Sequence, residues 1–156
     1  MAKPTNELGE LDRKILRVLQ EEANLPLDKI AAKVSASRTA VWNRIKRFEQ
    51  SGLIRRYQAL LDPAMVGLDH TFFVSVRTNR HDSDWLDRFS AAVETLPEIV
   101  EAHRLAGEAD YLLKVQVASA ADYDRFYRRL IDQIELYDVT SQLSMETIKP
   151  SAPLPV

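Results

Sequence analysis

Two short helical patterns, separated by a three-residue interruption, constrain the fold of this chain more than any other feature of its sequence. The first pattern lies in residues 27–34 and the second runs from Arg38 to about Ser51. Ser35-Ala36-Ser37 stands between them, and Gly52 supplies a stop after the second. The apolar stripes of the two patterns are Leu27, Ile30, Ala31 and Val34, then Val41, Ile45 and Phe48. A helix of about two turns, a tight turn and a second helix are the parts of a helix-turn-helix.

A further helix is predicted ahead of this pair, over residues 10–22. Its apolar stripe consists of Leu11, Ile15, Val18 and Leu19. Pro26 suits the first turn of the helix that follows, and the Ser37 hydroxyl is a predicted N-cap for the third helix. The sequence therefore predicts three helices before residue 52.

The polar face of the third predicted helix combines cations with short polar side chains. Cations bind phosphates, and short polar groups reach the edges of bases in the major groove. The residues predicted to bind DNA are Ser37, Arg38, Thr39, Asn43, Arg44, Lys46 and Arg47. Trp42, beside the apolar stripe, is interpreted as a packing residue. A merely solvated cationic helix face is the alternative interpretation of the same pattern.

Charge is divided unevenly along the 156 residues, whose formal net charge is −2. Residues 1–62 hold 12 Lys and Arg against 8 Asp and Glu, whereas residues 63–156 hold 9 against 15. A basic first part followed by an acidic second part indicates that only the first meets a polyanion. Cysteine is absent, which excludes disulfides and thiol chemistry. Neither a signal peptide nor a run of roughly 20 apolar residues is present, so a cytoplasmic protein without a membrane partner is expected.

After an extended segment that ends at Asp62-Pro63, the chain alternates between strand and helix periods. Strands are predicted over residues 70–78, 99–106, 110–118 and 139–148, and helices over residues 83–96 and 120–136. The helical stripes are Leu86, Phe89, Val93 and Leu96, then Tyr123, Phe126, Tyr127, Leu130 and Ile134. This order is the ferredoxin-like βαββαβ arrangement, so the predicted fold class is α+β.

Both helices of that arrangement are expected on one face of the sheet. The other face would show Phe73, Leu112, Lys114 and Gln116. That mixture is too apolar for water and too polar for a core, so a second copy of the sheet is expected to cover it. His70, His81 and His103 lack metal-ligand spacing, and no nucleophile elbow or phosphate loop is present. No metal, cofactor or catalytic residue is predicted.

Two stretches of the chain resemble the Lrp/AsnC family, the feast/famine transcription regulators of bacteria and archaea. They are SASRTAVWNRIKRFEQSGLIRRYQALLDP and LPEIVEAHRLAGEADYLLKV, and the similarity covers about residues 7–149. The family's Gly-x-x-Asp-Tyr signature stands here as Gly107-Glu108-Ala109-Asp110-Tyr111. The resemblance implies a winged helix-turn-helix domain (1–54), a connecting strand or linker (55–66), a ligand-sensing and oligomerisation domain (67–149) and a tail (150–156).

The resemblance also implies a sequence-specific DNA binder that responds to a small effector, usually an amino acid. It implies dimers, formed through the sheets, that assemble further into octamers. The effector residues that it implies are Leu105, Gly107, Asp110, Tyr111, Thr140 and Gln142. Two departures from the family pattern stand out: Gly9 replaces an aspartate that caps the first helix, and Ala109 replaces a tyrosine of the turn.

Three alternatives to this interpretation stay open at the level of sequence. Ordinary hairpin chemistry explains Gly107 and Asp110 without any ligand. A ligand-independent architectural DNA binder would carry the same helix-turn-helix. A sirohaem decarboxylase resembles the same architecture, but its His-Asn-Tyr-x-Arg signature is replaced here by His103-Arg104-Leu105-Ala106-Gly107.

Overall fold

The computed structural model describes residues 8–156, which pack as two compact units. The helical unit comprises the chain up to Ala59 together with Lys149–Val156, and the sheet unit comprises Leu60–Ile148. Each unit has its own cluster of buried apolar side chains. The predicted DNA-binding domain and the predicted ligand-sensing domain therefore each have a hydrophobic core of their own.

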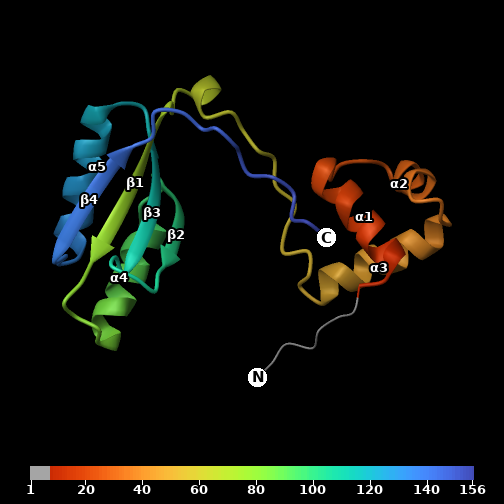
Figure 1. The fold of residues 1–156 in the computed structure, drawn as a ribbon, viewed down its shortest axis with the longest axis horizontal. Coiled ribbons are helices and arrows are strands. Elements are labelled where there is room, and N and C mark those ends of the chain that lie inside the picture. The colour runs from red at the N-terminus through yellow and green to blue at the C-terminus, as the bar shows by residue number, and fades with distance from the viewer. Residues whose placement is uncertain (1–7) are drawn as a thin grey trace. The chain divides into compact units, whose positions relative to one another are not determined.

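Three helices form the helical unit (Figure 1): α1 (Glu10–Glu21), α2 (Leu27–Lys33) and α3 (Arg38–Gln50). The Ser37 hydroxyl accepts a hydrogen bond from the Ala40 N–H at 3.2 Å, which confirms the predicted N-cap of α3. Gly52 has a φ of 74°, a left-handed conformation that glycine adopts without a steric cost. The start and the end of α3 are thus set by the two residues predicted to set them.

The core of the helical unit differs from the predicted stripes at two positions. Leu16 is buried beside Ile15, because α1 packs against both α2 and α3 and so buries a wide arc of its surface. Trp42 is 50% exposed, so its interpretation as a packing residue is wrong. The buried apolar residues are Ile15, Leu16, Leu19, Ile30, Ala31, Val34, Val41 and Phe48.

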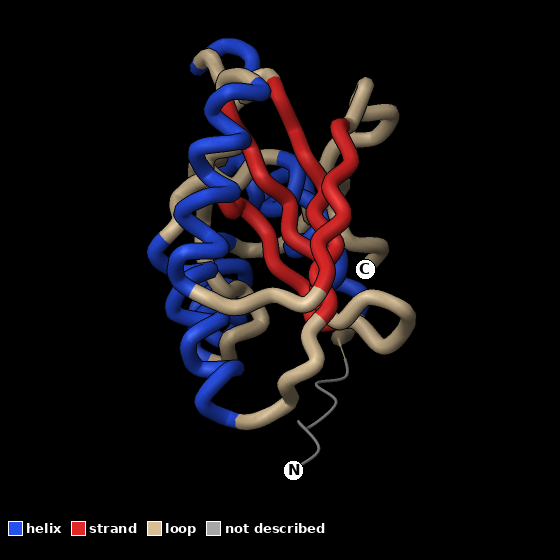
Figure 2. Tube along the Cα trace, turned by 90° about the vertical axis from the view of Figure 1, so that its left-hand side faces the viewer, coloured by secondary structure: helices blue, strands red, loops and turns tan. Residues whose placement is uncertain are grey.

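The sheet unit is a four-stranded antiparallel sheet covered on one face by two helices (Figures 1 and 2). The chain order is β1 (His70–Arg77), α4 (Ser83–Thr95), β2 (Ile99–Arg104), β3 (Tyr111–Val117), α5 (Ala120–Gln133) and β4 (Asp138–Leu143). The strand order β2-β3-β1-β4 brings the two ends of the unit, β1 and β4, side by side. The α+β class and the βαββαβ arrangement are therefore confirmed.

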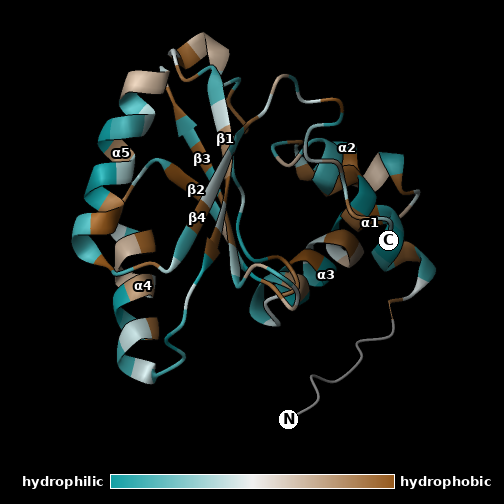
Figure 3. Ribbon diagram, turned by 60° about the vertical axis from the view of Figure 1, so that its left-hand side comes forward, coloured by the Kyte–Doolittle hydropathy of each residue, from teal (hydrophilic) through white to brown (hydrophobic). Residues whose placement is uncertain are grey.

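The face of the sheet beneath the helices is continuous apolar core. Phe72, Val74 and Val76 of β1 are buried there, as are Tyr111, Leu113, Val115 and Val117 of β3. The stripe predicted for α5 is confirmed at Phe126 and Leu130 and at Ile134, which directly follows the helix. Hydrophobic and hydrophilic positions alternate along α5 (Figure 3).

Helix α4 is rotated by about one position from its predicted stripe. Trp85, Phe89, Ala92 and Leu96 face the sheet, whereas Leu86 is 36% exposed. The Trp85 indole N–H donates to the Glu135 carbonyl at 2.9 Å, and its ring stacks on Phe89. Since a buried indole N–H must find an acceptor, this bond selects the rotation of the helix.

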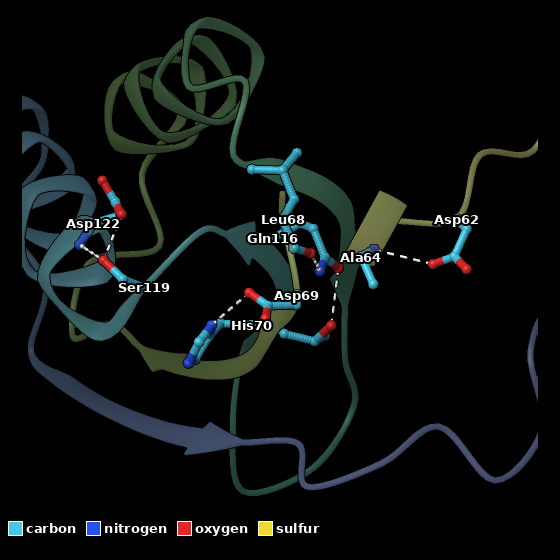
Figure 4. A network of polar contacts seen from close by, with 9 residues as sticks. Asp62, Ala64, Leu68, Asp69, His70, Gln116, Ser119 and Asp122 are labelled. Atoms are coloured by element: carbon cyan, nitrogen blue, oxygen red, sulfur yellow. Dashed lines mark hydrogen bonds and ion pairs between the residues drawn. The ribbon is translucent and has the colours of Figure 1, made fainter. Parts of the chain in front are cut away.

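The face of the sheet away from the helices, which carries Phe73, Leu112, Lys114 and Gln116, is called the open face. Its end at Gln116 is less exposed than predicted. Gln116 is only 8% exposed because its amide donates to the Leu68 carbonyl and accepts from the Thr71 hydroxyl at 2.9 Å (Figure 4). Phe73 remains 37% exposed. Strand β4 ends at Leu143 rather than at residue 148, and Met145 beyond it is 90% exposed.

Residues 55–62 form neither helix nor strand, and a short 3-10 helix, Ala64–Val66, follows them. Among the described residues no segment pairs with residues 55–62, so they form a linker within the single chain, and the connecting strand that the resemblance implies stays a prediction. Among the described residues, no helix combines the length and the apolar character needed to cross a membrane.

The Trp85 indole supplies a test of the sheet-unit core. Trp85→Phe removes the bond to the Glu135 carbonyl and leaves a cavity, so we expect a loss of about 1–3 kcal/mol in the free energy of unfolding. Urea denaturation of the full chain measures it. Trp42→Phe is the matched control and should change the unfolding free energy little, because Trp42 lies half in solvent. Equal losses for the two variants would contradict the assignment.

Candidate DNA-binding face and effector cavity

Helix α3 turns one continuous face to the solvent. Val41 and Phe48 are buried on its inner side, so the residues one half-turn away are exposed. The solvent face consists of Arg38, Thr39, Trp42, Asn43 and Lys46. Among residues 8–156, the Asn43 side chain has no hydrogen-bond partner, and Thr39 likewise has none. Their donors and acceptors are available to an external partner.

The two cations of this solvent face make only surface ion pairs. Arg38 lies 3.5 Å from Asp28 of α2, and Lys46 lies 2.9 Å from Glu49. The hydrogen bond from the Lys46 ammonium holds the pKa of the Glu49 carboxyl below its usual value. Exposed pairs of this kind contribute little to stability. Both cations can therefore exchange their carboxylate for a phosphate at small cost.

Arg44 and Arg47 occupy a different environment, because both lie against a buried carboxylate of α1. Asp12 is only 6% exposed. Its Oδ2 accepts from Arg47 Nη2 at 2.8 Å and from the Gly9 N–H at 3.2 Å, while Arg44 Nε lies 3.1 Å from Oδ1. The Arg44 contact is an ion pair that is not aligned as a hydrogen bond.

This cluster, Asp12 with Arg44 and Arg47, ties α3 to α1 and fixes two guanidinium groups at one flank of the exposed face. The Arg44 guanidinium also donates to the Ala40 carbonyl at 3.1 Å, which further limits its rotamers. Sequence reasoning missed Asp12, which is 35 residues from Arg47. A usable signal existed, since Asp12 lies at the third position of α1, where a carboxylate caps the helix.

The predicted effector turn is built around the carboxylate of Asp110. Its Oδ2 accepts from the Thr78 N–H at 2.8 Å, and its own N–H donates to the Val76 carbonyl at 3.0 Å. The Asp110 carbonyl in turn accepts from the Leu105 N–H at 2.8 Å. Asp110 thus joins the β2–β3 hairpin to the end of β1, and its carboxylate has a structural role.

Gly107 and Tyr111 occupy contrasting places in the same turn. The φ of Gly107 lies outside the left-handed region, and a Cβ built there meets no atom within 4 Å. The turn conformation alone therefore does not require glycine at this position. Tyr111 is 8% exposed, and its ring packs against Trp85 and Phe89 in the core. Only its backbone is near the turn surface.

A cavity of about 220 Å³ opens beside this turn, on the open face of the sheet. Its lining residues are Ser75, Arg77, Glu108, Ala109, Asp138 and Thr140. The pairing of β1 with β4 sets Ser75 opposite Thr140 and Arg77 opposite Asp138. Of the six effector residues predicted, Thr140 lines the cavity. Gln142 lies two residues further along β4, opposite Phe73.

Ser75, Arg77 and Asp138 are cavity residues that sequence reasoning did not find. They come together only because the first and last strands of the unit are neighbours, which the order of elements along the chain does not display. The cavity offers a guanidinium, two carboxylates and two hydroxyls within one small volume. This set matches a small zwitterion, whose carboxylate and ammonium need opposite partners.

Comparison with known proteins finds a family match in each part of the chain. Residues 8–55 match the winged helix-turn-helix DNA-binding family, and residues 71–154 match the Lrp/AsnC ligand binding domain. The chain belongs to the Lrp/AsnC family.

Its Lrp/AsnC relatives include the DNA-binding transcriptional activator DecR of Escherichia coli, 43% identical over 150 residues, or 96% of this chain and 99% of the relative. A crystal structure of an AsnC family transcriptional regulator from Agrobacterium tumefaciens is 50% identical, with a TM-score of 0.90 over 94% of this chain and 96% of that one. A transcriptional regulator from Neisseria meningitidis, solved with L-methionine, is 32% identical, with a TM-score of 0.89 over 95% and 96%.

The Asp12 cluster predicts a stability effect in the helical unit. Asp12→Asn keeps the size of the side chain but removes the charge that faces Arg44 and Arg47. We expect a loss of about 1–2 kcal/mol, below the range for fully buried pairs because both arginines are partly exposed. Circular dichroism during thermal unfolding measures the effect. Glu10→Gln, at an exposed acid of the same helix, is the control and should leave the transition within experimental error.

Proposed function

We propose that this chain is a sequence-specific transcription regulator of the cytoplasm, without enzymatic activity, whose binding to double-stranded DNA responds to an amino acid. One observation carries the DNA part of this proposal: α3 presents a solvent face of cations and unpaired short polar side chains, and an ion cluster around the buried Asp12 flanks this face. The family matches support the same assignment.

In this proposal α3 is the recognition helix. Thr39 and Asn43 reach base edges, and the amide of Asn43 suits the two hydrogen-bonding groups of adenine. Arg38 and Lys46 bind phosphates in exchange for their present carboxylate partners. Arg44 and Arg47 contribute from a fixed position, since Asp12 holds them before DNA arrives. The Ser37 hydroxyl is already committed to the N-cap, so it serves DNA binding by placing the start of α3.

Substitutions on α3 separate phosphate contacts from base contacts. Lys46→Ala should weaken binding to all sequences and reduce the slope of log affinity against log salt by about 0.9. Asn43→Ala should leave that slope unchanged and relax the preference among sites, with about 1–3 kcal/mol of discrimination lost at one base pair. Fluorescence anisotropy with promoter fragments and scrambled fragments measures both quantities.

Lys14→Ala is the control for the DNA experiment, because Lys14 is a cation of α1 that pairs with Glu10. It should preserve the salt slope. A slope that stays the same in Lys46→Ala, or changes as much in Lys14→Ala, would remove Lys46 from the phosphate contacts.

For the effector, we propose the cavity beside the Gly107 turn as the binding site. Arg77 would receive the carboxylate of an amino acid, and Glu108 or Asp138 its ammonium. The absence of a side chain at Gly107 leaves room for a ligand or for a second copy of the chain. Asp110 supports the site by holding the hairpin to β1. Leu105 stays in the proposed contact set, being 41% exposed beside the turn, whereas the buried ring of Tyr111 leaves that set.

Arginine substitutions test the cavity. Titration calorimetry with the twenty amino acids should find at least one ligand for the unaltered chain, and Arg77→Ala should weaken its binding at least tenfold. Arg80→Ala is matched to it, because Arg80 pairs with Asp82 and does not line the cavity. No ligand for the unaltered chain, or equal weakening by both variants, would refute the assignment.

A homodimer through the open face of the sheet, with further assembly towards an octamer, completes the proposal. Exposed apolar side chains support it: Phe73, Val100 and Leu105 are between 37% and 53% exposed. Monomeric surfaces rarely leave several such groups together in water. A two-fold dimer would also present two recognition helices to two half-sites.

A further inference from the structure

The last eight residues of the sequence, Lys149–Val156, form no helix or strand, yet they belong to the helical unit. The side-chain amide of Gln20, on α1, makes two hydrogen bonds to the backbone of this segment. Its Nε2 donates to the Leu154 carbonyl at 3.2 Å, and its Oε1 accepts from the Leu154 N–H at 2.7 Å. A glutamine side chain here occupies both backbone groups of one residue, as a neighbouring β-strand would.

Two more contacts extend this attachment along the segment. Arg17, one helical turn before Gln20, donates its Nε–H to the Val156 carbonyl at 2.6 Å. The Val156 side chain packs against the apolar core of the helical unit, whereas Leu154 keeps its side chain 71% exposed. Recognition therefore rests on the backbone of Leu154, on the Val156 carbonyl and on the partly buried side chain of Val156.

Arg17 and Gln20 form a docking surface on α1 that lies outside the α3 face. Both residues are exposed, and they are three positions apart, which puts them on the same side of the helix. Backbone groups that pair in this way are satisfied without water, so an extended segment gains order there. The occupant seen in the structure is the chain's own segment 149–156.

The covalent path gives this docking a mechanical consequence. The chain leaves the helical unit through residues 55–69, all of which are exposed and carry no strand. It returns after Ile148, where the sheet unit ends. When segment 149–156 is docked, the sheet unit is connected to the helical unit twice, by the linker before β1 and by the segment after β4. When the segment is released, only the exposed linker before β1 connects the two units.

We propose that residues 149–156 are a strap, whose docking on Arg17 and Gln20 restricts the motion of the helical unit relative to the sheet unit. The docking is intramolecular, so a few contacts suffice to populate it, since a tethered segment is present at millimolar effective concentration. Because the contacts are few, modest changes at either end shift the balance between docked and released states.

In a dimer that binds DNA, restraining the helical unit of each copy limits the distances that the two recognition helices can adopt. This consequence rests on the function proposed above. A chain with a docked strap should discriminate strongly between half-sites one helical turn apart and half-sites half a turn out of phase. A chain with a released strap should tolerate both spacings.

Gln20→Glu tests the docking, because it keeps the side-chain size and replaces the donor to the Leu154 carbonyl with a repelling oxygen. Gln50→Glu makes the same change on an exposed glutamine of the same unit that has no hydrogen-bond partner among the described residues. Hydrogen exchange followed by NMR should show the Leu154 amide, which donates to Gln20, exchanging about tenfold faster in Gln20→Glu than in the unaltered chain or in Gln50→Glu. Equal exchange in all three proteins would refute the docking.

Two readouts test the restraint itself. Small-angle X-ray scattering of the full chain should give a larger maximum dimension for Gln20→Glu than for Gln50→Glu. The ratio of affinities for in-phase and out-of-phase half-sites should fall at least about threefold in Gln20→Glu, with single half-site affinity unchanged.

A released peptide with unchanged scattering would overturn the strap, and so would an unchanged affinity ratio. A complete lack of DNA binding by the unaltered chain would instead refute the proposed function, and exchange and scattering would still decide the strap.

Discussion

The one-sided apolar character of nearly every element is the constraint on which both units depend. Helices α1 to α5 and strands β1 and β3 each bury one apolar face, whereas the edge strands β2 and β4 bury little. Hydrophobic burial of those faces supplies the driving force for folding. The opposite faces are left over: the solvent face of α3 in one unit and the open face of the sheet in the other. Both candidate sites lie on these opposite faces, so the packing that stabilises the chain also determines which side chains each candidate site presents.

Electrostatics in the helical unit follow from this packing. The sequence gathers four cations on α3, and the structure gives each of them a carboxylate within 4.0 Å. All four pairs stand at least partly in water, and they draw on acids that α1, α2 and α3 bring close. The positive potential of the face is therefore smaller than a count of its cations suggests. What the pairs add is orientation, because a guanidinium fixed by a buried carboxylate loses less freedom on meeting a phosphate.

Communication between the effector cavity and the recognition helix requires an element with two states that both ligands bias. The cavity lies at the end of β1 and the start of β4, whereas the linker precedes the start of β1 and segment 144–156 follows the end of β4. A ligand in the cavity would therefore have to act along the length of the β1–β4 pair to reach the covalent connections to the helical unit. The free energy available for such coupling is limited to the difference in ligand affinity between the two states.

The sequence by itself determined which elements form and which residues cap them. Helical and alternating periodicities located three helices and a βαββαβ unit, and Ser37 and Gly52 marked the limits of α3, because these signals act between residues a few positions apart. It also identified the turn at Gly107, although it could not say what the turn faces.

Only the tertiary structure decided which distant residues meet, since contact between residues about 30 or more positions apart depends on packing and not on local propensity. Asp12 reaches Arg44 and Arg47 because α1 packs on α3, and Arg77 reaches Asp138 because the first strand pairs with the last. The exposure of Trp42 and the rotation of α4 towards Trp85 were settled in the same way. Several helical stripes satisfied the sequence, and the buried hydrogen bond from Trp85 to Glu135 fits only one of them.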